Sequence, residues 1–413
     1  MTILLARADA RALPLADGSV QTCITSPPYW NLRAYETGSS KHLELGSEST
    51  PGEYVQHMID VFREIRRVLR DDGTVWLTLG DNYATSPPGN KPNTTALSSG
   101  LPNSIANQEM RRAAQAPPRD YDSAGLKQKD LIGIPWRVAL ALQADDWYLR
   151  AEIIWAKSLS FCPSYSGSCM PDSTTDRPTR SHEHLFLLTK KPRYFYDQEA
   201  IREPCVMKPQ RRHSRRPPDE TPRGGEQPQQ TWSTTVERDE PEIDGNPAGR
   251  NLRSVWTINP TSYKGAHYAT FPEKLVEPCL LAGTSAKGAC ASCGSPWERL
   301  IETDSPSKEF ADDDDRGWAN THQKTSNPQS SKSLHRDEGG VYSTAKVLGW
   351  QRTCKCETEE VRPCVVLDPF CGTATVAQVA IQHKRRAVCF DLSAEYLQDL
   401  ATKRTHNVQV ELF

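Results

Sequence analysis

The tetrapeptide Ser26-Pro27-Pro28-Tyr29 combines groups that could hold an amino group for reaction. Prolines lack an N–H, so this turn offers carbonyl acceptors without competing donors. The Ser26 hydroxyl adds an acceptor, and Tyr29, with Trp30 beside it, offers an aromatic face for a planar base. The exocyclic amine of a base is a poor nucleophile and needs such a hold. A strand-ending Pro-Pro turn with a packed aromatic is the alternative interpretation.

A second group of residues, LDPFCGTATV, lies between an apolar strand-like segment and a helical one. A turn of small residues there lets the backbone approach a ligand and directs helix N–H groups toward it. The next strand-like segment, RAVCFD, ends at Asp391, roughly 20 residues later, a spacing typical of a carboxylate that binds ribose hydroxyls. The alternative is a structural strand–helix unit with a surface aspartate.

Four of the 12 cysteines are spaced like metal ligands. Cys290-x-x-Cys293 and Cys354-x-Cys356 could complete a tetrahedral zinc site, with Gly294 allowing the first pair to turn beneath the metal. Four protein ligands would make the zinc structural, because no position is left for water. Unligated, reducible thiols are the alternative. We expect the remaining cysteines to be core or incidental residues: Cys23, Cys162, Cys169, Cys205, Cys279, Cys364, Cys371 and Cys389.

Alternating strand and helix patterns must position these residues. Strands are predicted to end near Asp9 and to cover Thr22–Thr25, and a helical stripe runs from Pro51 to Asp72, where Gly73 ends it. Further segments are TVWLTLGD (strand), IGIPWRVALALQ (helix), WYLRAEIIWAK and HLFLLTK (strands). A helix over 270–283 has Thr270 and Glu273 in capping-box spacing, and Pro278 should kink or divide it. The order predicts an α/β fold with a parallel sheet covered on both faces.

Composition narrows the class of protein. The chain has 413 residues with a formal net charge of −2, so any affinity for nucleic acid must come from local basic patches. The mean hydropathy is −0.65, which indicates long solvated segments around a compact core. The sequence has neither a membrane-length apolar run nor a signal-peptide core, which favours a cytoplasmic location and reduced thiols.

The two motifs together resemble the permuted (beta) group of DNA amino-methyltransferases, in which the S/D-P-P-Y motif precedes the cofactor motif. Further blocks that resemble the family are DARALPLADGSVQTCITSPPYWNLRAY, VFREIRRVLRDDGTVWLTLGDNY, WYLRAEIIWAK and HYATFPEKLVEPCLLAGT. Roughly half the chain is covered. The resemblance implies a Rossmann-like S-adenosylmethionine-dependent methyltransferase fold with circularly permuted motifs and insertions.

By that resemblance, Ser26, Pro27, Pro28 and Tyr29 would be catalytic. The cofactor S-adenosylmethionine would lie against two groups of residues. Phe271, Pro272 and Lys274 would cover its methionine moiety, and Asp9 would reach its adenine. The others would line the pocket: Asp368, Phe370, Gly372, Thr373 and Asp391. The chain departs from the family at Ala374, where a second glycine is usual.

Serine at position 26 resembles members that methylate the cytosine N4 amine, whereas members acting on adenine N6 more often have aspartate. We therefore expect methylation of cytosine N4 in double-stranded DNA after the base flips out, with adenine N6 as the alternative. The rival acceptors are RNA and a protein amide, but the glutamine-modifying relatives carry N-P-P-Y and the unpermuted order, both absent here. A non-catalytic zinc-bearing DNA-binding protein is a further rival, which the retention of both motifs disfavours. A cytosine carbon-5 methylase is disfavoured, because the Pro-Cys pairs at Cys205, Cys279 and Cys364 lack a matching strand–turn context.

The expected domain is discontinuous, comprising residues 1–84, 129–200, 262–288 and 362–413. Residues 85–128 would form a mobile loop and 289–361 a cysteine-pinned insertion. Residues 201–261 would form a target-recognition insertion, in which a basic stretch could contact DNA through Arg211, Arg212, Arg215 and Arg216. A solvated linker is the alternative for that stretch. The resemblance also names a cognate restriction nuclease as a candidate partner.

Overall fold

The computed structural model describes residues 2–31, 44–84, 120–169, 172, 174–204, 206–207, 243–244, 249–261, 271–304, 344–394, 396–405 and 409–412. The chain divides into two compact units. The larger unit comprises Met1–Ile201, Arg253–Arg299 and Trp350–Phe413, and the smaller comprises Arg202–Leu252 and Leu300–Gly349. Within the smaller unit, β6 (Val206–Met207) pairs antiparallel with β7 (Ile243–Asp244). All sequence-predicted site residues that the structure describes belong to the larger unit.

The larger unit is built on a nine-stranded sheet of order β15-β1-β14-β13-β2-β3-β5-β4-β8. Its strands are β1 (Thr2–Arg7), β2 (Val20–Thr25), β3 (Leu69–Leu79), β4 (Tyr148–Ala156), β5 (His182–Thr189), β8 (Val255–Thr257), β13 (Val365–Asp368), β14 (Arg386–Asp391) and β15 (Gln409–Leu412). Neighbouring strands are parallel except for β5, which runs antiparallel to both β3 and β4. The prediction of a parallel sheet is therefore wrong for β5. The order is that of a Rossmann-like α/β fold.

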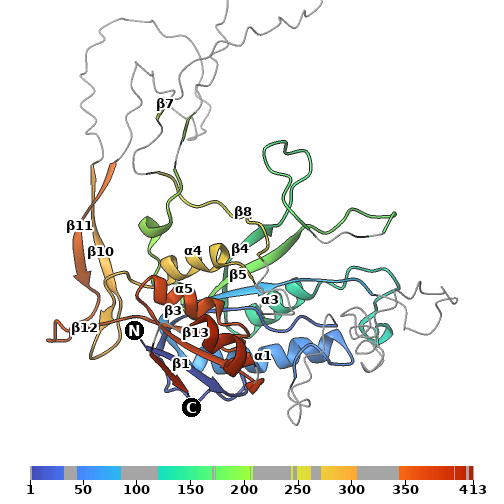
Figure 1. Ribbon diagram of the computed structural model, residues 1–413, viewed down its shortest axis with the longest axis horizontal. Coiled ribbons are helices and arrows are strands. Elements are labelled where there is room, and N and C mark those ends of the chain that lie inside the picture. Colours follow the sequence, from blue (N-terminus) through green and yellow to red (C-terminus); the bar gives the residue numbers. More distant parts are fainter. Residues whose placement is uncertain are drawn as a thin grey trace, which may run out of the picture. The chain divides into compact units, whose positions relative to one another are not determined.

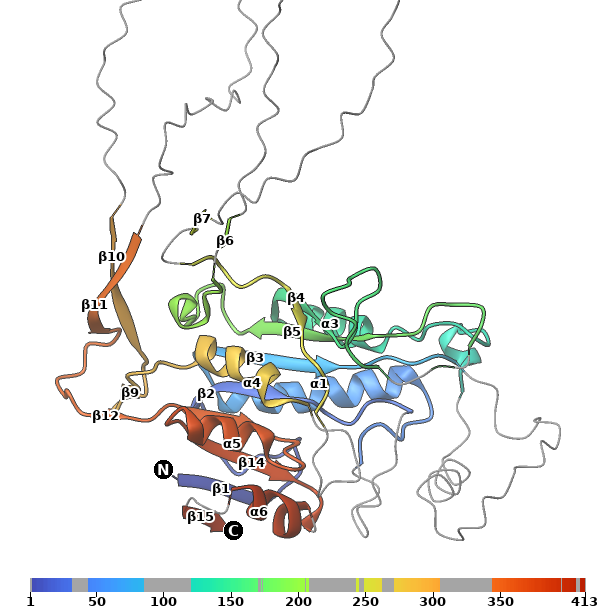
Figure 2. The same ribbon diagram turned by 45° about the horizontal axis from the view of Figure 1, so that its top comes forward.

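Helices cover both faces of this sheet (Figures 1 and 2). On one face, Cys23 and Val75 join a core cluster with residues of α1 (Pro51–Val68) and α3 (Ile134–Ala144). The alternate residues Thr22 and Thr74 face α4 (Glu273–Gly283), which contacts α5 (Thr375–Gln382). Since side chains alternate along a strand, these contacts place the two helix pairs on opposite faces. The prediction that both faces are covered is confirmed.

Helix α1 begins as a capping box and ends earlier than its apolar stripe predicts. The Thr50 side chain accepts from the Glu53 amide, and the Glu53 carboxylate accepts from the Thr50 amide. The helix ends at Val68, not near Asp72, because Leu69 is already extended and pairs with Val20 of β2. Sheet pairing therefore overrides the helical pattern over the last four residues.

Helix α4 differs from its prediction in two ways. Pro272 is the N-cap and makes no side-chain cap bond, so the helix begins at Glu273 and not with a capping box from Thr270. Thr270 itself lies outside the described residues. Pro278 lies inside a single undivided helix, with Val276 and Leu280 buried on either side of it. Burial of these apolar residues offsets the backbone hydrogen bond that proline cannot donate.

Shorter elements complete the described chain. They are the 3-10 turns η2 (Asp122–Ala124) and η3 (Gln198–Ile201), the π-helical turn η4 (Tyr396–Ala401), α6 (Thr402–Arg404), and the paired strands β9 (Ala289–Cys290) with β12 (Val361–Arg362) and β10 (Trp297–Asp304) with β11 (Thr344–Arg352). Of the predicted mobile loop, residues 85–119 lie outside the described part. Among the described helices, none has the length and apolarity to cross a membrane.

Candidate active site

The parallel strands β1, β14, β13, β2 and β3 all end at one edge of the sheet, which we call the carboxyl edge. Both sequence motifs lie there, on adjacent strands. Thr25, the last residue of β2, donates a hydrogen bond of 2.8 Å from its hydroxyl to Asp368 Oδ1, the last residue of β13. The Ser26-Pro27-Pro28-Tyr29 turn and the Asp368–Thr373 turn therefore begin side by side.

The Ser-Pro-Pro-Tyr turn is held by two side chains and one stretch of backbone from three other segments. Tyr54 of α1 donates to the Pro28 carbonyl at 2.9 Å. The Tyr29 hydroxyl receives a hydrogen bond of 3.2 Å from Ser26 and donates one of 2.7 Å to Glu183 of β5. A Cβ at Gly80, just after β3, would come within 2.5 Å of the Tyr29 ring. The ring is thus packed on one side against bare backbone, while the residue stays partly exposed.

Trp30 does not supply the second aromatic face suggested by the sequence. Its side chain is buried, its indole N–H donates to the Glu48 carbonyl at 3.0 Å, and its ring meets Tyr121 edge-on. Tyr29 is thus the available aromatic of the pair.

Sequence reasoning missed the residues that support this turn. Glu183, Tyr54 and Gly80 come from β5, α1 and the end of β3, and only the folded sheet brings them to Tyr29. Asp81, which follows Gly80, accepts from the amides of Gly133 and Ile134 at the start of α3. The polar start of β5, where Glu183 lies between His182 and His184, was the available signal.

The second turn is tied to the ends of β13 and β14 by backbone amides. The Phe370 amide donates to Asp368 Oδ1 at 3.1 Å. The Gly372 amide donates to Asp391 Oδ2 at 3.0 Å, and the Ser393 amide to Asp391 Oδ1 at 2.8 Å. Ala374, the N-cap of α5, has φ 59° and ψ 40°, a left-handed conformation that favours glycine. The position where the family usually has glycine therefore does require a positive φ.

Burial at this turn raises the pKa of both aspartates. Desolvation is the main cause for Asp368, whose pKa rises to about 7, while the hydrogen bond from Thr25 works against the rise. Desolvation likewise raises the pKa of Asp391. Asp368 Oδ2 is buried and has no hydrogen-bond partner among the described residues. An unpaired buried carboxylate oxygen is costly, and a cationic or hydrogen-bonding ligand would relieve that cost.

The segment that begins α4 lies beside the same turn. Arg404 of α6 donates to Thr373 Oγ1 at 3.0 Å and to Glu273 Oε1 at 3.2 Å, so it links α4 to the start of α5. Pro272 is buried, Phe271 is half-buried and Lys274 is exposed. Asp9, two residues beyond β1, is at the carboxyl edge with its carboxylate bound by Arg11 at 3.0 Å.

These residues fit S-adenosylmethionine. The cofactor carries an α-ammonium group, a sulfonium and a pair of ribose hydroxyls. Asp368 offers a buried acceptor without a described partner, and Asp391 keeps acceptor capacity after its two amide bonds, since a carboxylate has about four lone-pair sites. A Cβ at Gly372 would meet no atom within 4 Å, which leaves open space beside the turn.

The four predicted metal ligands come together. The Sγ atoms of Cys290, Cys293, Cys354 and Cys356 lie within 4.8 Å of one another. Gly294 has φ 72°, which is the turn expected beneath a metal. The knuckle is docked on the opposite end of the sheet from Ser26, which we call the amino edge: Arg70 of β3 donates to the Cys293 carbonyl at 2.6 Å.

Of the other cysteines, Cys23, Cys279, Cys364, Cys371 and Cys389 are buried, as expected of core residues. Cys162 and Cys169 are partly exposed, and Cys205 lies outside the described residues. The predicted DNA-contacting arginines, Arg211, Arg212, Arg215 and Arg216, also lie outside them.

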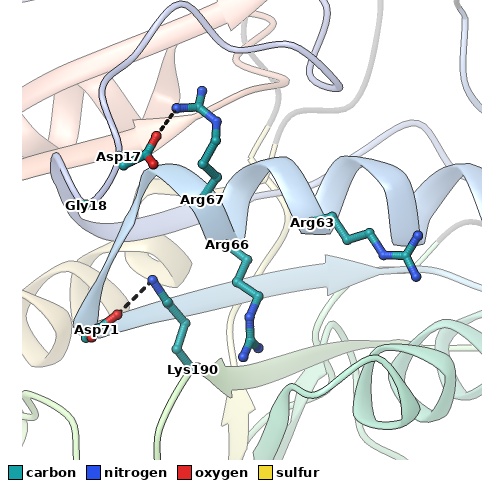
Figure 3. Close-up of a pocket in the computed structure, with 7 residues that line it drawn as sticks. All are labelled: Asp17, Gly18, Arg63, Arg66, Arg67, Asp71 and Lys190. Atoms are coloured by element: carbon teal, nitrogen blue, oxygen red, sulfur yellow. Dashed lines mark hydrogen bonds and ion pairs between the residues drawn. The ribbon is translucent and has the colours of Figure 1, made fainter.

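A basic pocket of about 560 Å³ lies near the end of α1, at the amino edge (Figure 3). Its cations already have partners. Arg67 pairs with Asp17, Lys190 with Asp71, and Arg63 with Asp145. Arg66 donates to the Asp146 carbonyl at 2.7 Å. Because its charges are satisfied and it is far along the strands from both motifs, this pocket is not the candidate active site.

Comparison with known proteins decides the family. A family model described as DNA methylase, of the N6/N4 type, matches residues 20–291. The chain belongs to this family. It is 37% identical over 282 residues to the type II methyltransferase M.SmaI of Serratia marcescens, covering 68% of this chain and 75% of that protein. It is 38% identical over 270 residues to M.Cfr9I of Citrobacter freundii, covering 65% and 68%.

Solved structures resemble the chain only distantly. PvuII DNA methyltransferase (cytosine-N4-specific) aligns at 13% identity with a TM-score of 0.45, over 99% of this chain and 96% of that one. The family assignment therefore rests on the sequence relatives. The chain is a type II DNA methyltransferase of the N4/N6 amino-methyltransferase family, so the predicted family and fold are confirmed.

Proposed function

We propose that this methyltransferase transfers a methyl group from S-adenosylmethionine to the exocyclic N4 amine of cytosine in double-stranded DNA. The observation that carries the proposal is the Thr25–Asp368 hydrogen bond, which sets the amine-holding turn beside the cofactor turn. The Ser26 side chain favours cytosine over adenine. Family members that the chain resembles at this site have serine at this position and methylate the cytosine N4 amine.

The chain's own groups would hold and aim the target amine. When bound, S-adenosylmethionine supplies an electrophilic methyl group on sulfonium. A flipped cytosine would stack on the exposed side of the Tyr29 ring and donate its two amine protons to Ser26 Oγ and the Pro27 carbonyl. Both acceptors sit on a stiff turn, so little entropy is lost at reaction. Asp368 and Asp391, with Phe271 and Lys274 nearby, would bind the cofactor.

The deciding experiment incubates the full chain with isotopically labelled S-adenosylmethionine and duplex DNA, followed by nucleoside mass spectrometry. Labelled N4-methylcytosine is the expected product. Labelled N6-methyladenine would overturn the choice of base, and label in RNA, in protein or in no product would overturn the proposal as a whole. The matched variants are Ser26→Ala, which should slow transfer with cofactor affinity kept, and Asp391→Ala, which should weaken cofactor binding first.

We propose in addition that the four-cysteine cluster binds one structural zinc ion. Four thiolates fill a tetrahedral shell. Zinc–sulfur bonds of about 2.3 Å suit four Sγ atoms that lie within 4.8 Å of one another. Its docking on Arg70, at the amino edge, separates it from the proposed chemistry. Metal analysis of the purified chain should find one zinc per molecule, and Cys293→Ser should lower that value while Cys162→Ser, at a partly exposed thiol outside the cluster, should not. Equal zinc in all three proteins, or none in the native chain, would reject the site.

We also propose that residues 201–261 recognise the target sequence. Four arginines of this segment would contact phosphates or guanine edges: Arg211, Arg212, Arg215 and Arg216. Replacing these four arginines with alanine should weaken DNA binding and reduce its dependence on salt, without changing cofactor affinity.

A further inference from the structure

The hydroxyl of Ser26 is the first member of a hydrogen-bonded chain that ends in an ion pair. Ser26 Oγ lies 3.2 Å from Tyr29 Oη, and Tyr29 Oη lies 2.7 Å from Glu183 Oε2. The other oxygen of Glu183 is ion-paired with Lys157, which follows β4. The pairing of β4 with β5 sets Trp155 opposite Glu183 and so brings Lys157 into reach. Glu183 and Lys157 are both largely buried, with side chains 16% and 23% exposed.

The direction of each hydrogen bond in this chain follows from the chemistry of its members. An ionised carboxylate can only accept, so Tyr29 must donate its single proton to Glu183. Tyr29 Oη can then only accept from Ser26, whose own single proton is thereby committed. What remains on Ser26 Oγ is lone-pair density. The network thus leaves a hydroxyl, normally both donor and acceptor, able to act only as an acceptor toward a substrate.

We propose that Glu183 is a positioning residue that fixes Ser26 as an acceptor for the target amine, acting through Tyr29. The inference rests on the proposed function and deepens it. A serine held in this way can only accept hydrogen bonds from the amine. It therefore acts like the aspartate carboxylate that other members of the family have at this position. A serine free to rotate would spend part of its time pointing its proton at the amine, which repels it.

The central test is Glu183→Gln. The carboxamide keeps the shape, but Lys157 selects its oxygen, so the NH₂ group faces Tyr29 and donates to it. Tyr29 must then donate to Ser26, so both hydrogen bonds between Ser26, Tyr29 and residue 183 reverse their direction. We expect kcat to fall by roughly 10- to 100-fold, the scale of losing one charge-assisted hydrogen bond, with cofactor affinity and KM for DNA within about 2-fold. The matched control is Glu152→Gln, which disturbs the neighbouring Glu152–His184 pair of 2.7 Å on the adjacent strand and leaves the Ser26–Tyr29–Glu183 chain intact.

Adding Glu183→Gln to two other variants shows whether Glu183 acts by setting the direction of the hydrogen bonds or only by supporting the structure. In Tyr29→Phe the link is already cut, so adding Glu183→Gln should cost less than about 2-fold more; additive losses would overturn the proposal. In Ser26→Asp the acceptor is a carboxylate that needs no orientation, so Glu183→Gln should cost less than about 3-fold. A full loss in an active Ser26→Asp background would also overturn it.

The outcomes distinguish this inference from the proposed function. If native protein transfers no methyl group to DNA, the function fails. If native protein is active and Glu183→Gln is equally active, only the positioning role fails. Thermal melting and cofactor titration of each variant identify misfolding, and a Glu183→Gln protein that misfolds leaves the decision to Tyr29→Phe, whose kcat must fall by at least about 10-fold for the proposal to stand.

Discussion

Thr25 and Asp368 are 343 residues apart in the sequence, yet the Thr25 hydroxyl donates to the Asp368 carboxylate across adjacent strands at 2.8 Å. This bond joins the turn that would hold the target amine to the turn that would hold the cofactor. It also leaves the second oxygen of Asp368 buried without a partner among the described residues. One oxygen of the Asp368 carboxyl group therefore links the two turns, while the other remains available to a ligand.

Asp368 should make the stability of the protein without cofactor fall as pH rises. Burial raises its pKa to about 7 in the folded state, so the folded protein binds a proton that the unfolded chain releases near pH 4. The resulting loss in the free energy of unfolding is absent below pH 4, grows up to pH 7, and reaches on the order of 4 kcal/mol above pH 7. Asp368→Asn should therefore gain stability relative to the native chain by about 2 kcal/mol more at pH 8 than at pH 5. Chemical denaturation at both pH values measures this difference; a gap that does not change with pH would contradict it. The variant should also bind cofactor more weakly.

Ala374 should show a strain that glycine would relieve. A left-handed conformation costs a non-glycine residue roughly 1–2 kcal/mol, which offsets the entropy and buried-methyl losses of mutation to glycine. Ala374→Gly should leave the free energy of unfolding within about 1 kcal/mol of the native value. Ala377→Gly, at an equally buried position inside α5, lacks that relief and should cost about 1–2 kcal/mol more than Ala374→Gly. Equal costs would show that Ala374 is not strained.

Gly80 should be required for placing Tyr29. A Cβ there would lie 2.5 Å from the ring, so Gly80→Ala must displace either the ring or the end of β3. Since a misplacement of about 1 Å can cost 100-fold, we expect kcat for DNA methylation to drop at least 10-fold with little change in cofactor affinity. Gly349→Ala is the control, because a Cβ at that position meets nothing within 4 Å. Comparable activity in the two variants would argue against the tight packing.

If the cysteine cluster binds zinc as proposed, removal of that ion should destabilise the protein without direct effect on the chemistry. A chelator should lower the melting temperature by roughly 5–10 °C, and added zinc should restore it. Below that melting temperature, initial methylation rates should change by less than about 2-fold, because the cysteine knuckle docks on the amino edge. A chelator that stops turnover while the fold persists would instead assign the metal to catalysis.

Local patterns predicted much of the framework. The strands ending at Arg7 and Thr25 and the helix over Ile134–Ala144 match their apolar periodicity and turn residues. The cysteine spacing likewise anticipated the Sγ cluster. Errors arose where a distant partner decides the conformation. Leu69 leaves the helical pattern because it pairs with Val20, and β5 pairs antiparallel with both β3 and β4, a direction that its own residues do not indicate.

The supporting residues of the active site were not predictable for the same reason. Nothing near Glu183 in the sequence indicates that Tyr29 is its partner, 154 residues away. The positive φ of Ala374 was indicated only by the resemblance, in which glycine is usual at this position, since alanine itself seldom adopts it. The motifs themselves are local and visible, whereas the groups that orient them depend on the pairing of strands.

The adjacency of β2 and β13 has a consequence for synthesis of the protein. A ribosome completes the strand that ends at Thr25 early, but its neighbour ending at Asp368 emerges only 343 residues later. Until then the nascent sheet lacks β13 and the still later β14, and the turn that begins at Ser26 has no turn from β13 beside it. Folding must join strands that lie this far apart in the chain, which implies slow maturation and a nascent chain unable to methylate DNA before Asp368 has emerged.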